Sequence, residues 1–516
     1  MRIVFPYGLN ENEQPDIGEA YKESQNFKLS KSTVSFQPRS PFDSVATATN
    51  ASEVKGLMQL VKRDSTQTTL VQAGDTVYKW DGASTFSNVA TVTSTSKLRA
   101  SYWSLDDHLI ITDIQKATVV KKWDGTTFAS LTTGLAGALY AKYSVVHQGR
   151  VWLFNITEAT TSLPHVILAS AFEDPENYSS SLRSGDSSFL TGDEAFFLVT
   201  PDVREINGVA VFRDLLIIST KEGRLFKLTG TDSTNYAFEE FYTGSAAIGN
   251  ETMVNIGNDV VYMRAGGNIE SLVATDTFGD VATDDLSRFI PTQVDGLSDG
   301  IAVYDQSRQM VMFFVTGKVL VLFKDILPSG FSPWSVYKTD HTSNFTTSVA
   351  VYMRRPGTSE FTVYFGGSAG QIYDLNGDGN GDGGSVDIVA RRKTRYIDKQ
   401  AAQVDFSRQI LTGRVIYRRL SEVELGVTLQ WGDTYHDSEA FITLKGPPAG
   451  DSGIYYGGTI YYGQSIYYGQ GFGFAQRLSS KGFSSTGKGP GFFLSAEVQS
   501  DRDFQIDEIR IPDEIP

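Results

Sequence analysis

Cysteine is absent from all 516 residues of the chain. Its absence excludes disulfides, thiolate-bound zinc, iron–sulfur clusters and a thiol nucleophile. Only five histidines are present, and none of them falls in a His-x-His or His-Glu-x-x-His arrangement. No run approaches the roughly 18 apolar residues of a membrane-spanning helix, and the first residues lack the pattern of a signal peptide. Together these absences predict a soluble protein made in a reducing cytoplasm.

Basic residues are scarce compared with acidic ones. Lys and Arg number 45 against 60 Asp and Glu, which gives a formal net charge of -15. A chain this acidic is not expected to hold DNA or an anionic membrane through its average electric field. The same charge is compatible with a surface that lets a polyanion slide past without trapping it, because trapping requires Lys and Arg.

Helical periodicity is almost absent, and short apolar runs dominate instead. Hydrophobic residues make up 40% of the chain, and they occur in runs of Val, Ile, Leu, Phe and Tyr bounded by Gly, Asp, Asn or Ser. Such runs are typical of β-strands. The sequence therefore predicts an all-β protein with enough apolar residues for packed cores.

One internal repeat is sharp. The tetrapeptide Lys79-Trp80-Asp81-Gly82 returns as Lys122-Trp123-Asp124-Gly125, 43 residues later, and each copy is followed by a Thr-Phe pair. This interval matches the length of a four-stranded propeller blade. We expect a strand that ends in a tight Asp-Gly turn, with the indole packed between sheets.

A weaker repeat, of polar turn residues followed by an apolar strand, follows the same rhythm. Copies occupy residues 107–111, 149–154, 213–218, 258–262, 308–314 and 360–364, and Thr69-Leu70-Val71 fits as an earlier copy. Six or seven blades fit these intervals. The longest interval predicts a surface insertion near residues 173–201.

These patterns divide the chain into three parts. Residues 1–45 are polar and interrupted by prolines, which predicts an N-terminal extended arm lying on another surface. Residues 46–390 form the predicted β-propeller. Beyond a Gly/Asp-rich run, residues 391–516 form a C-terminal β-domain that ends in an alternating, half-buried strand.

No catalytic signature emerges from the sequence. Residues 366–370 match the Gly-x-Ser-x-Gly of a hydrolase elbow, but a strand rather than a helix follows them, so a hairpin turn is the better interpretation. Paired carboxylates are common, yet nothing places two of them around a glycosidic bond. We therefore predict that the protein is not an enzyme and needs no cofactor; a propeller glycosidase or lyase remains an alternative.

The weak metal candidates are Asp374, Asn376 and Asp378, which resemble the start of a calcium loop because hard oxygen ligands alternate along the chain. The twelfth position is Ser385 instead of the expected bidentate Glu, and Asp382 or Asp387 could substitute for it. A solvated turn between domains is therefore preferred over a calcium site.

Two segments are candidates for an interface or a gate. An Ile-Tyr-Tyr-Gly unit repeats every six residues within the Tyr/Gly-rich loop 454–469, and the even period keeps each residue type on one face of a strand. Its tyrosines are Tyr455, Tyr456, Tyr461, Tyr462, Tyr467 and Tyr468. A flexible loop without a special role is an equal alternative. The basic segment Arg391, Arg392 and Lys393 favours a salt bridge to an acidic neighbouring subunit over nucleic-acid binding.

The whole arrangement resembles virion proteins of the nozzle (tail tubular protein B) type, from short-tailed bacteriophages. The resemblance is carried by Asn26-Phe27-Lys28-Leu29, by Arg39-Ser40-Pro41-Phe42-Asp43, by the Trp-Asp-Gly blades, by residues 257–272 and by the closing residues 506–512. The family is structural, so the resemblance transfers no catalytic residue.

The resemblance implies a homohexameric ring below the portal and adaptor of a virion tail, assembled in the bacterial host cytoplasm. Such a ring would conduct and gate double-stranded DNA without binding it specifically, and would dock the tail adaptor and tail fibre proteins. The alternative is a receptor- or glycan-binding propeller module of a virion, with the tyrosines of residues 455–468 stacking on sugar rings.

Overall fold

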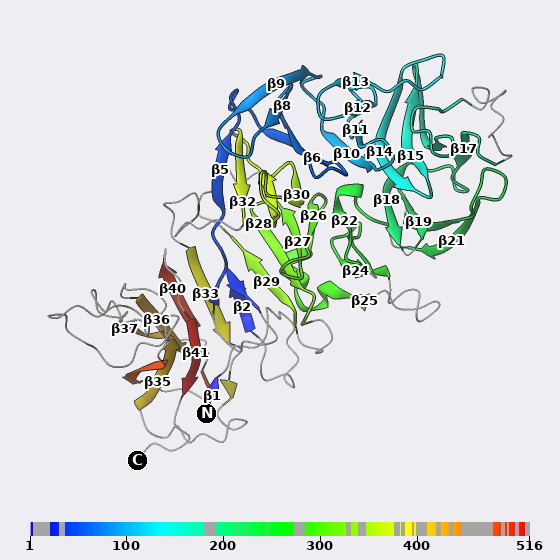
Figure 1. Ribbon diagram of the computed structural model, residues 1–516. Coiled ribbons are helices and arrows are strands. Elements are labelled where there is room, and N and C mark those ends of the chain that lie inside the picture. Colours follow the sequence, from blue (N-terminus) through cyan, green and yellow to red (C-terminus); the bar gives the residue numbers. More distant parts are fainter. Residues whose placement is uncertain are drawn as a thin grey trace. The chain divides into compact units, whose positions relative to one another are not determined.

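The computed structural model describes residues 2–3, 21–29, 37–179, 192–212, 214–221, 223–244, 246–257, 259–272, 284–326, 332–338, 347–375, 382, 388–394, 397–398, 410–418, 425–432, 437–444, 478–486, 491–492, 495–500 and 505–510. Within these ranges the chain is almost entirely β-structure (Figure 1). It forms two compact units. The propeller unit comprises Ser44–Gly317 and Thr342–Asn376, and the second unit comprises Met1–Asp43, Lys318–His341 and Gly377–Pro516.

The fold is a seven-bladed β-propeller, which confirms the all-β propeller class and selects seven from the predicted six or seven blades. The first blade contains β6 (Val54–Val61), β7 (Gln67–Ala73), β8 (Thr76–Trp80) and β9 (Phe86–Thr91). The second contains β10 (Leu98–Trp103), β11 (His108–Asp113), β12 (Lys121–Trp123) and β13 (Phe128–Ser130). The third contains β14 (Leu139–His147), β15 (Arg150–Glu158), β16 (Thr161–Ala169) and β17 (Phe196–Val199).

The remaining blades follow in chain order. The fourth contains β18 (Ile206–Phe212), β19 (Leu215–Thr220), β20 (Arg224–Thr229) and β21 (Ala237–Thr243). The fifth contains β22 (Met253–Asn255), β23 (Val260–Met263), β24 (Ile269–Ser271) and β25 (Asp284–Asp285). The sixth begins with the hairpin of β26 (Ile301–Asp305) and β27 (Met310–Val315). The described helices are short: η1 (Asn250–Thr252), η2 (Leu286–Phe289) and α2 (Pro291–Val294).

The seventh blade joins strands that are far apart in the sequence. It contains β30 (Ala350–Arg354), β31 (Phe361–Gly366), β32 (Gln371–Asp374) and, beside β32, the early strand β5 (Asp43–Thr47). Hydrogen bonds from Ala48 N to Gly370 O and from Val54 N to Gly367 O continue this connection. The ring is thus closed by hydrogen bonds between the beginning and the end of the propeller sequence.

The first strands of the blades line the propeller axis. They contact one another in a closed ring in the order β6, β10, β14, β18, β22, β26, β30 and again β6. Between blades, the buried side chains form separate clusters. Leu98, Leu109 and Trp123 of the second blade, for example, pack on Met58 and Leu60 of the first. The hydrophobic core is therefore divided into seams, and each seam is the layer of buried side chains between two neighbouring blades. A blade inside the ring is covered by a neighbour on each of its faces, so its strands can carry apolar side chains on both faces.

The structure confirms what the repeats predicted. Both Trp-Asp-Gly turns link the third strand of a blade to its fourth, and Trp80 and Trp123 are buried. The Trp80 ring lies parallel to the Phe86 ring at 6.2 Å. Every described copy of the weaker repeat, including Thr69–Val71, falls on the second strand of a blade. The interval between copies is therefore the blade interval. The predicted insertion 173–201 overlaps the connection from β16 to β17 and includes β17 itself.

The second unit contains strands from three separate stretches of the chain. In one sheet the strand order is β28 (Lys318–Phe323), β29 (Trp334–Tyr337), β2 (Tyr21–Gln25), β33 (Ile388–Thr394), β40 (Ser495–Ser500), β36 (Leu425–Gly432) and β37 (Asp437–Leu444). In another it is β1 (Arg2–Ile3), β41 (Gln505–Arg510), β35 (Ile410–Arg418) and β38 (Leu478–Thr486). Two pairs complete it: β3 (Phe27–Lys28) with β4 (Gln37–Pro38), and β34 (Ile397–Asp398) with β39 (Gly491–Phe492).

This arrangement groups the chain differently from the three-part division drawn from the sequence. The predicted arm, residues 1–45, contributes β2 to the middle of a sheet, between β29 and β33. Residues 377–516 share their unit with residues 1–43 and 318–341. The two stretches of the propeller sequence thus alternate along the chain with the three stretches of the second unit.

A buried arginine ties the N-terminal segment into the second unit. The Arg39 guanidinium forms an ion pair with Asp382, and Nη1 lies 2.8 Å from Asp382 Oδ1. It also donates to Asn26 Oδ1 at 3.0 Å and to the carbonyl of Lys338 at 3.0 Å, and it lies over the Phe42 ring. Both charged side chains are almost fully buried, so their mutual contact compensates for the loss of hydration.

Candidate functional site

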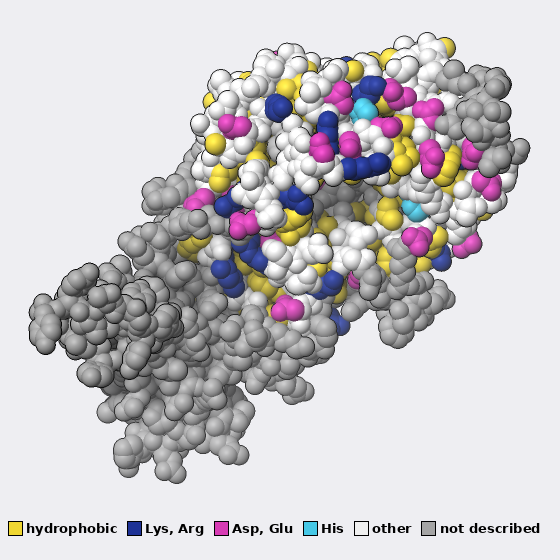
Figure 2. Space-filling model, in the orientation of Figure 1, with side chains coloured by type: hydrophobic (Ala, Val, Ile, Leu, Met, Phe, Trp, Pro, Cys, Tyr) yellow, Lys and Arg dark blue, Asp and Glu magenta, His cyan; other side chains and the backbone are white. Residues whose placement is uncertain are grey.

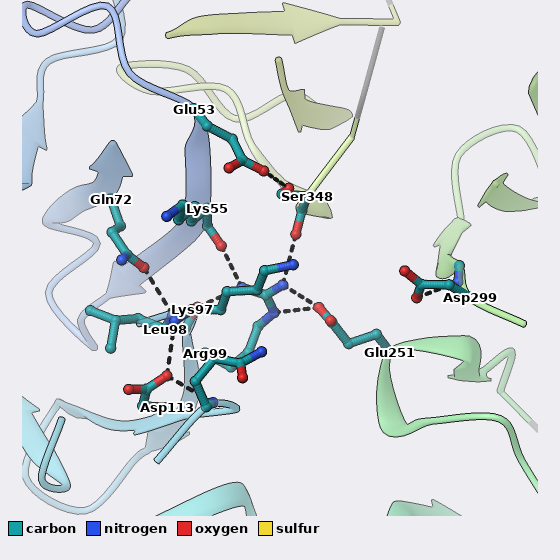
Figure 3. Close-up of polar contacts among 12 residues, drawn as sticks. Glu53, Lys55, Gln72, Lys97, Leu98, Arg99, Asp113, Glu251, Asp299 and Ser348 are labelled. Carbon is teal, nitrogen blue, oxygen red and sulfur yellow. Dashed lines mark hydrogen bonds and ion pairs between the residues drawn. The ribbon is translucent and has the colours of Figure 1, made fainter. Parts of the chain in front are cut away.

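Charged side chains gather where the first strands of the blades begin. Arg99, on β10, lies at the centre of one group, the axial cluster, which also contains Lys55, Glu251 and Ser348 (Figure 3). Arg99 Nε donates to Glu251 Oε1 at 2.7 Å, and Nη1 donates to the carbonyl of Lys55 at 2.7 Å. Nη2 donates to the carbonyl of Ser348 at 2.9 Å.

The axial cluster spans the propeller axis. Arg99 belongs to the second blade, whereas Glu251 lies in η1, directly before the first strand of the fifth blade. Ser348 precedes the first strand of the seventh blade, and Lys55 lies on that of the first. Because blades two and five face each other across a seven-membered ring, the Arg99 side chain bridges the axis. The side chains of Arg99 and Glu251 are each 23% exposed.

A second group, the lysine cluster, lies between the second, third and fourth blades. It consists of Lys116, Lys142, Asn155, Glu205 and Lys221. Lys142 Nζ donates to Glu205 Oε1 at 2.8 Å, and Lys221 forms an ion pair with the same carboxylate. Lys116 Nζ donates to Asn155 Oδ1 at 3.0 Å, while the Asn155 amide nitrogen donates to Glu205 Oε1 at 3.2 Å.

The lysines hold Glu205 in its charged form. Burial on its own would raise the pKa of this carboxyl, but hydrogen bonds and charge attraction from Lys142 and Lys221 outweigh it and lower the pKa to about 2. A carboxyl with so low a pKa is ionised at neutral pH and does not donate a proton there. Glu205 therefore acts as a charged acceptor for Lys142 and Lys221.

Replacing Glu205 by Gln should destabilise the protein in a pH-dependent way. The folded-state pKa lies below the ordinary value of 4.5, so the stabilisation is complete above about pH 5 and is lost as the pH falls toward 2. At pH 7 we expect E205Q to lose about 1 kcal/mol of unfolding free energy. Urea unfolding of wild type and variant between pH 7 and 3 measures this difference. A difference that stays constant down to pH 3 would contradict the pairing.

The face of the molecule in Figure 2 carries acidic and basic side chains side by side over the described part of the propeller. This mixture agrees with the paired contacts of the two clusters. Water partly screens the charges in such pairs, so each pair adds little to the free energy of unfolding. Their main effect is to position the strands and loops that carry them.

The calcium candidates are only partly covered by the structure. Asp374, at the end of β32, is fully buried and accepts hydrogen bonds from Arg355 Nη2 at 2.7 Å and from Thr362 Oγ1 at 2.8 Å. Asn376 and Asp378 lie outside the described residues. Among the described residues, no group of three or more His, Cys, Asp or Glu side chains could hold a metal ion.

The interface candidates fall in different places. Arg391, Arg392 and Lys393 lie on β33, whose backbone pairs with β2 on one side and with β40 on the other. This basic segment is therefore an internal strand of its sheet. The six candidate tyrosines Tyr455, Tyr456, Tyr461, Tyr462, Tyr467 and Tyr468 lie outside the described residues.

The Gly-x-Ser-x-Gly match is a hairpin turn, as predicted. It leads directly from β31 into β32, and both strands pair in antiparallel register. No helix follows the serine, so the context of a nucleophile elbow is missing.

Among the described residues, no helix has the length and the apolar character needed to cross a membrane.

Sequence reasoning missed both charged clusters. Their members are single Lys, Arg and Glu residues without a local motif, and the contacts join residues far apart in the sequence. One signal was present: Lys55, Arg99, Lys142, Glu205 and Glu251 each fall at or just before the first strand of a blade. Their positions relative to the start of the strand differ from blade to blade, so no fixed spacing marks them in the sequence.

No protein-family model matches the sequence, and no curated protein matches it. Solved structures with a similar fold include the extracellular domain of the hybrid two-component system BT4673 from B. thetaiotaomicron. It matches with a TM-score of 0.42 and 10% identity over 81% of this chain and 48% of that chain. This chain therefore spans about half the length of that structure.

Two further structures are virginiamycin B lyase from Staphylococcus aureus and PorZ, a bacterial surface component of the type-IX secretion system of Porphyromonas gingivalis. The lyase matches with a TM-score of 0.37 and 10% identity over 64% of this chain and 98% of the lyase. PorZ matches with a TM-score of 0.37 and 10% identity over 66% of this chain and 38% of PorZ. At these identities the likeness concerns the propeller fold alone.

Proposed function

We propose that the protein is a structural component of a short-tailed bacteriophage tail. In this role it forms a homohexameric, nozzle-like ring that conducts and gates DNA and docks the tail adaptor and tail fibre proteins. The sequence resemblance described above motivates the proposal. The ring would be assembled in the bacterial host cytoplasm and would reside in the virion tail.

The observation that carries the structural role is the ion pair across the propeller axis. Arg99 and Glu251 connect opposite blades, and Arg99 also bonds to Lys55 and Ser348. Through these contacts the guanidinium group of Arg99 joins four blades of the propeller. Such charge-assisted hydrogen bonds support the interpretation of the propeller as a rigid docking module. In the lysine cluster, the lowered pKa of Glu205 likewise supports charge pairing over catalysis.

The bridged axis also bears on the path of DNA in the proposed nozzle. A duplex has no passage along an axis that the Arg99 side chain crosses. In our proposal the conduit is therefore formed by several copies of the chain around a common axis. The net charge of -15 favours transit without tight binding, since few Lys and Arg are available to replace the counterions of DNA.

Imaging of the purified full-length protein by negative stain, at several concentrations, tests the proposal. We expect class averages with six-fold rings around a central hole. A chain that stays monomeric at every concentration would argue against the ring. Rings that bind double-stranded DNA tightly, with a steep loss of affinity at higher salt, would contradict the conduit.

The receptor- or glycan-binding alternative depends on the tyrosines between residues 455 and 468. Those residues lie outside the described part of the chain. No geometry among the described residues favours this alternative.

A further inference from the structure

We propose that the lysine cluster is a binding site for a phosphate group. The site consists of Lys116, Lys142 and Lys221, with Asn155 in contact with Lys116 and with Glu205 as the competing negative charge. This inference is independent of the proposed tail function, because it concerns the local chemistry of one seam of the propeller.

Positive charge exceeds negative charge in the lysine cluster. The ammonium groups of Lys142 and Lys221 donate to the Glu205 carboxylate, whereas that of Lys116 donates to Asn155, whose amide also donates to Glu205. Among the described residues, Glu205 is the only acidic side chain to which these lysines donate a hydrogen bond. The site therefore carries an excess of about two positive charges in a chain whose net charge is -15. An anion of charge two would neutralise it.

The backbone has an unusual conformation at two residues of the lysine cluster. Asn155 is completely buried, has a φ of 54° and lies at a β-bulge between Phe154 and Ile156. Lys116, which it contacts, has a φ of 53°. Left-handed conformations of residues other than glycine cost of order 1 kcal/mol each and gather at ligand sites. Here the bulge directs the Asn155 amide toward both Lys116 and Glu205, and so fixes where their charges lie.

The ammonium groups of the lysine cluster repel one another and remain accessible to solvent. Burial lowers the pKa of Lys116, and the positive charge of Lys142 lowers it further. The side chains of Lys142 and Lys221 are 25% and 60% exposed, respectively, so a solute can approach them. A bound anion would relieve the repulsion between the lysines, which gives binding a favourable electrostatic contribution.

The arrangement suits phosphate better than carboxylate. A phosphate group offers at least three oxygens in a tetrahedral arrangement, whereas a carboxylate offers two in one plane. Lysines that approach from three blades can each donate to a different oxygen of a phosphate. Lysine binds phosphate as a mobile point charge and needs no planar, bidentate geometry.

Calorimetric titration of the full-length protein, at constant ionic strength, tests the site. The probes are inorganic phosphate, glycerol phosphate and a short DNA oligonucleotide, which separate a free anion, a monoester and a phosphodiester. We expect wild type to bind inorganic phosphate, and both K116M and K221M to weaken binding about tenfold, since each removes one charged hydrogen-bond donor. E205Q should bind phosphate several-fold more tightly, because the competing carboxylate charge is gone.

The matched control is K55M. Lys55 lies on the first strand of the first blade and its ammonium donates to the Ser94 carbonyl, outside the lysine cluster. K55M should bind phosphate as wild type does. No binding by wild type, equal losses in K55M and K221M, or weaker binding by E205Q would each overturn the proposal. Because Lys221 is largely exposed, K221M tests the site even where K116M disturbs the fold.

Discussion

Replacing Asp382 by Asn should destabilise the protein by about 3–5 kcal/mol, since the Arg39 guanidinium would keep its charge and lose its carboxylate partner at a buried position. The Asp382 carboxylate also accepts a hydrogen bond from the Phe42 backbone N–H at 2.9 Å. R39M should cost a similar amount, because it leaves that carboxylate buried and unpaired. Urea or guanidinium unfolding of the full-length chain at pH 7 measures both losses.

An exposed pair supplies the control for this prediction. Arg224 Nη1 lies 3.6 Å from Glu240 Oε2, and each of the two side chains is 45% exposed. R224M should therefore cost at most about 1 kcal/mol. The double variant R39M/D382N should lose less than the sum of the two single variants, because it leaves no isolated charge. If D382N were no less stable than R224M, the buried pair would not hold the N-terminal segment in place.

Truncating Trp123 to Ala should cost about 3–5 kcal/mol, because it leaves a cavity in the seam between the first two blades. The indole is 1% exposed and packs with Leu60, Leu70 and Leu109, among others. Its Nε1–H is buried and has no hydrogen-bond partner. W123F should therefore lose only about 1–2 kcal/mol, since phenylalanine refills most of the space and removes an unsatisfied donor.

The repeat provides a matched comparison for this substitution. Trp80 occupies the equivalent position of the first blade, but its Nε1 donates to the Ala83 carbonyl at 2.8 Å. W80F should therefore lose about 1 kcal/mol more than W123F, the value of one hydrogen bond. Thermal unfolding of the two variants measures the difference. Equal losses would show that the hydrogen bond of Trp80 contributes nothing to stability.

The fold was predictable because its signals are local. The Trp-Asp-Gly turns and the apolar second strands follow from side chains within a few residues of one another, and their return at blade intervals indicates a propeller. The seam positions of Trp80 and Trp123 follow from the same rule. The tail function remains a proposal, since it came from a resemblance and not from a motif with its own chemistry.

Pairings between distant residues were not predictable in the same way. No residue near Asp382 in the sequence indicates that Arg39 is its partner. The Gly/Asp run around Asp382 indicated a solvated turn instead. Asp374 likewise resembled a calcium ligand, whereas in the structure it bonds to Arg355 and Thr362. A carboxylate that faces solvent and one that is paired in a core look alike when only their neighbours in sequence are known.

The sequence by itself determined the all-β class and the blade rhythm, because both depend on the alternation and spacing of residues along a single strand or turn. It also set the acidic charge and the absence of thiol chemistry. Only the tertiary structure decided that there are seven blades, that β5 closes the ring, and that Arg99 meets Glu251 across the axis. Those outcomes depend on which strands meet after the chain closes on itself, and such contacts between distant residues leave no local pattern in the sequence.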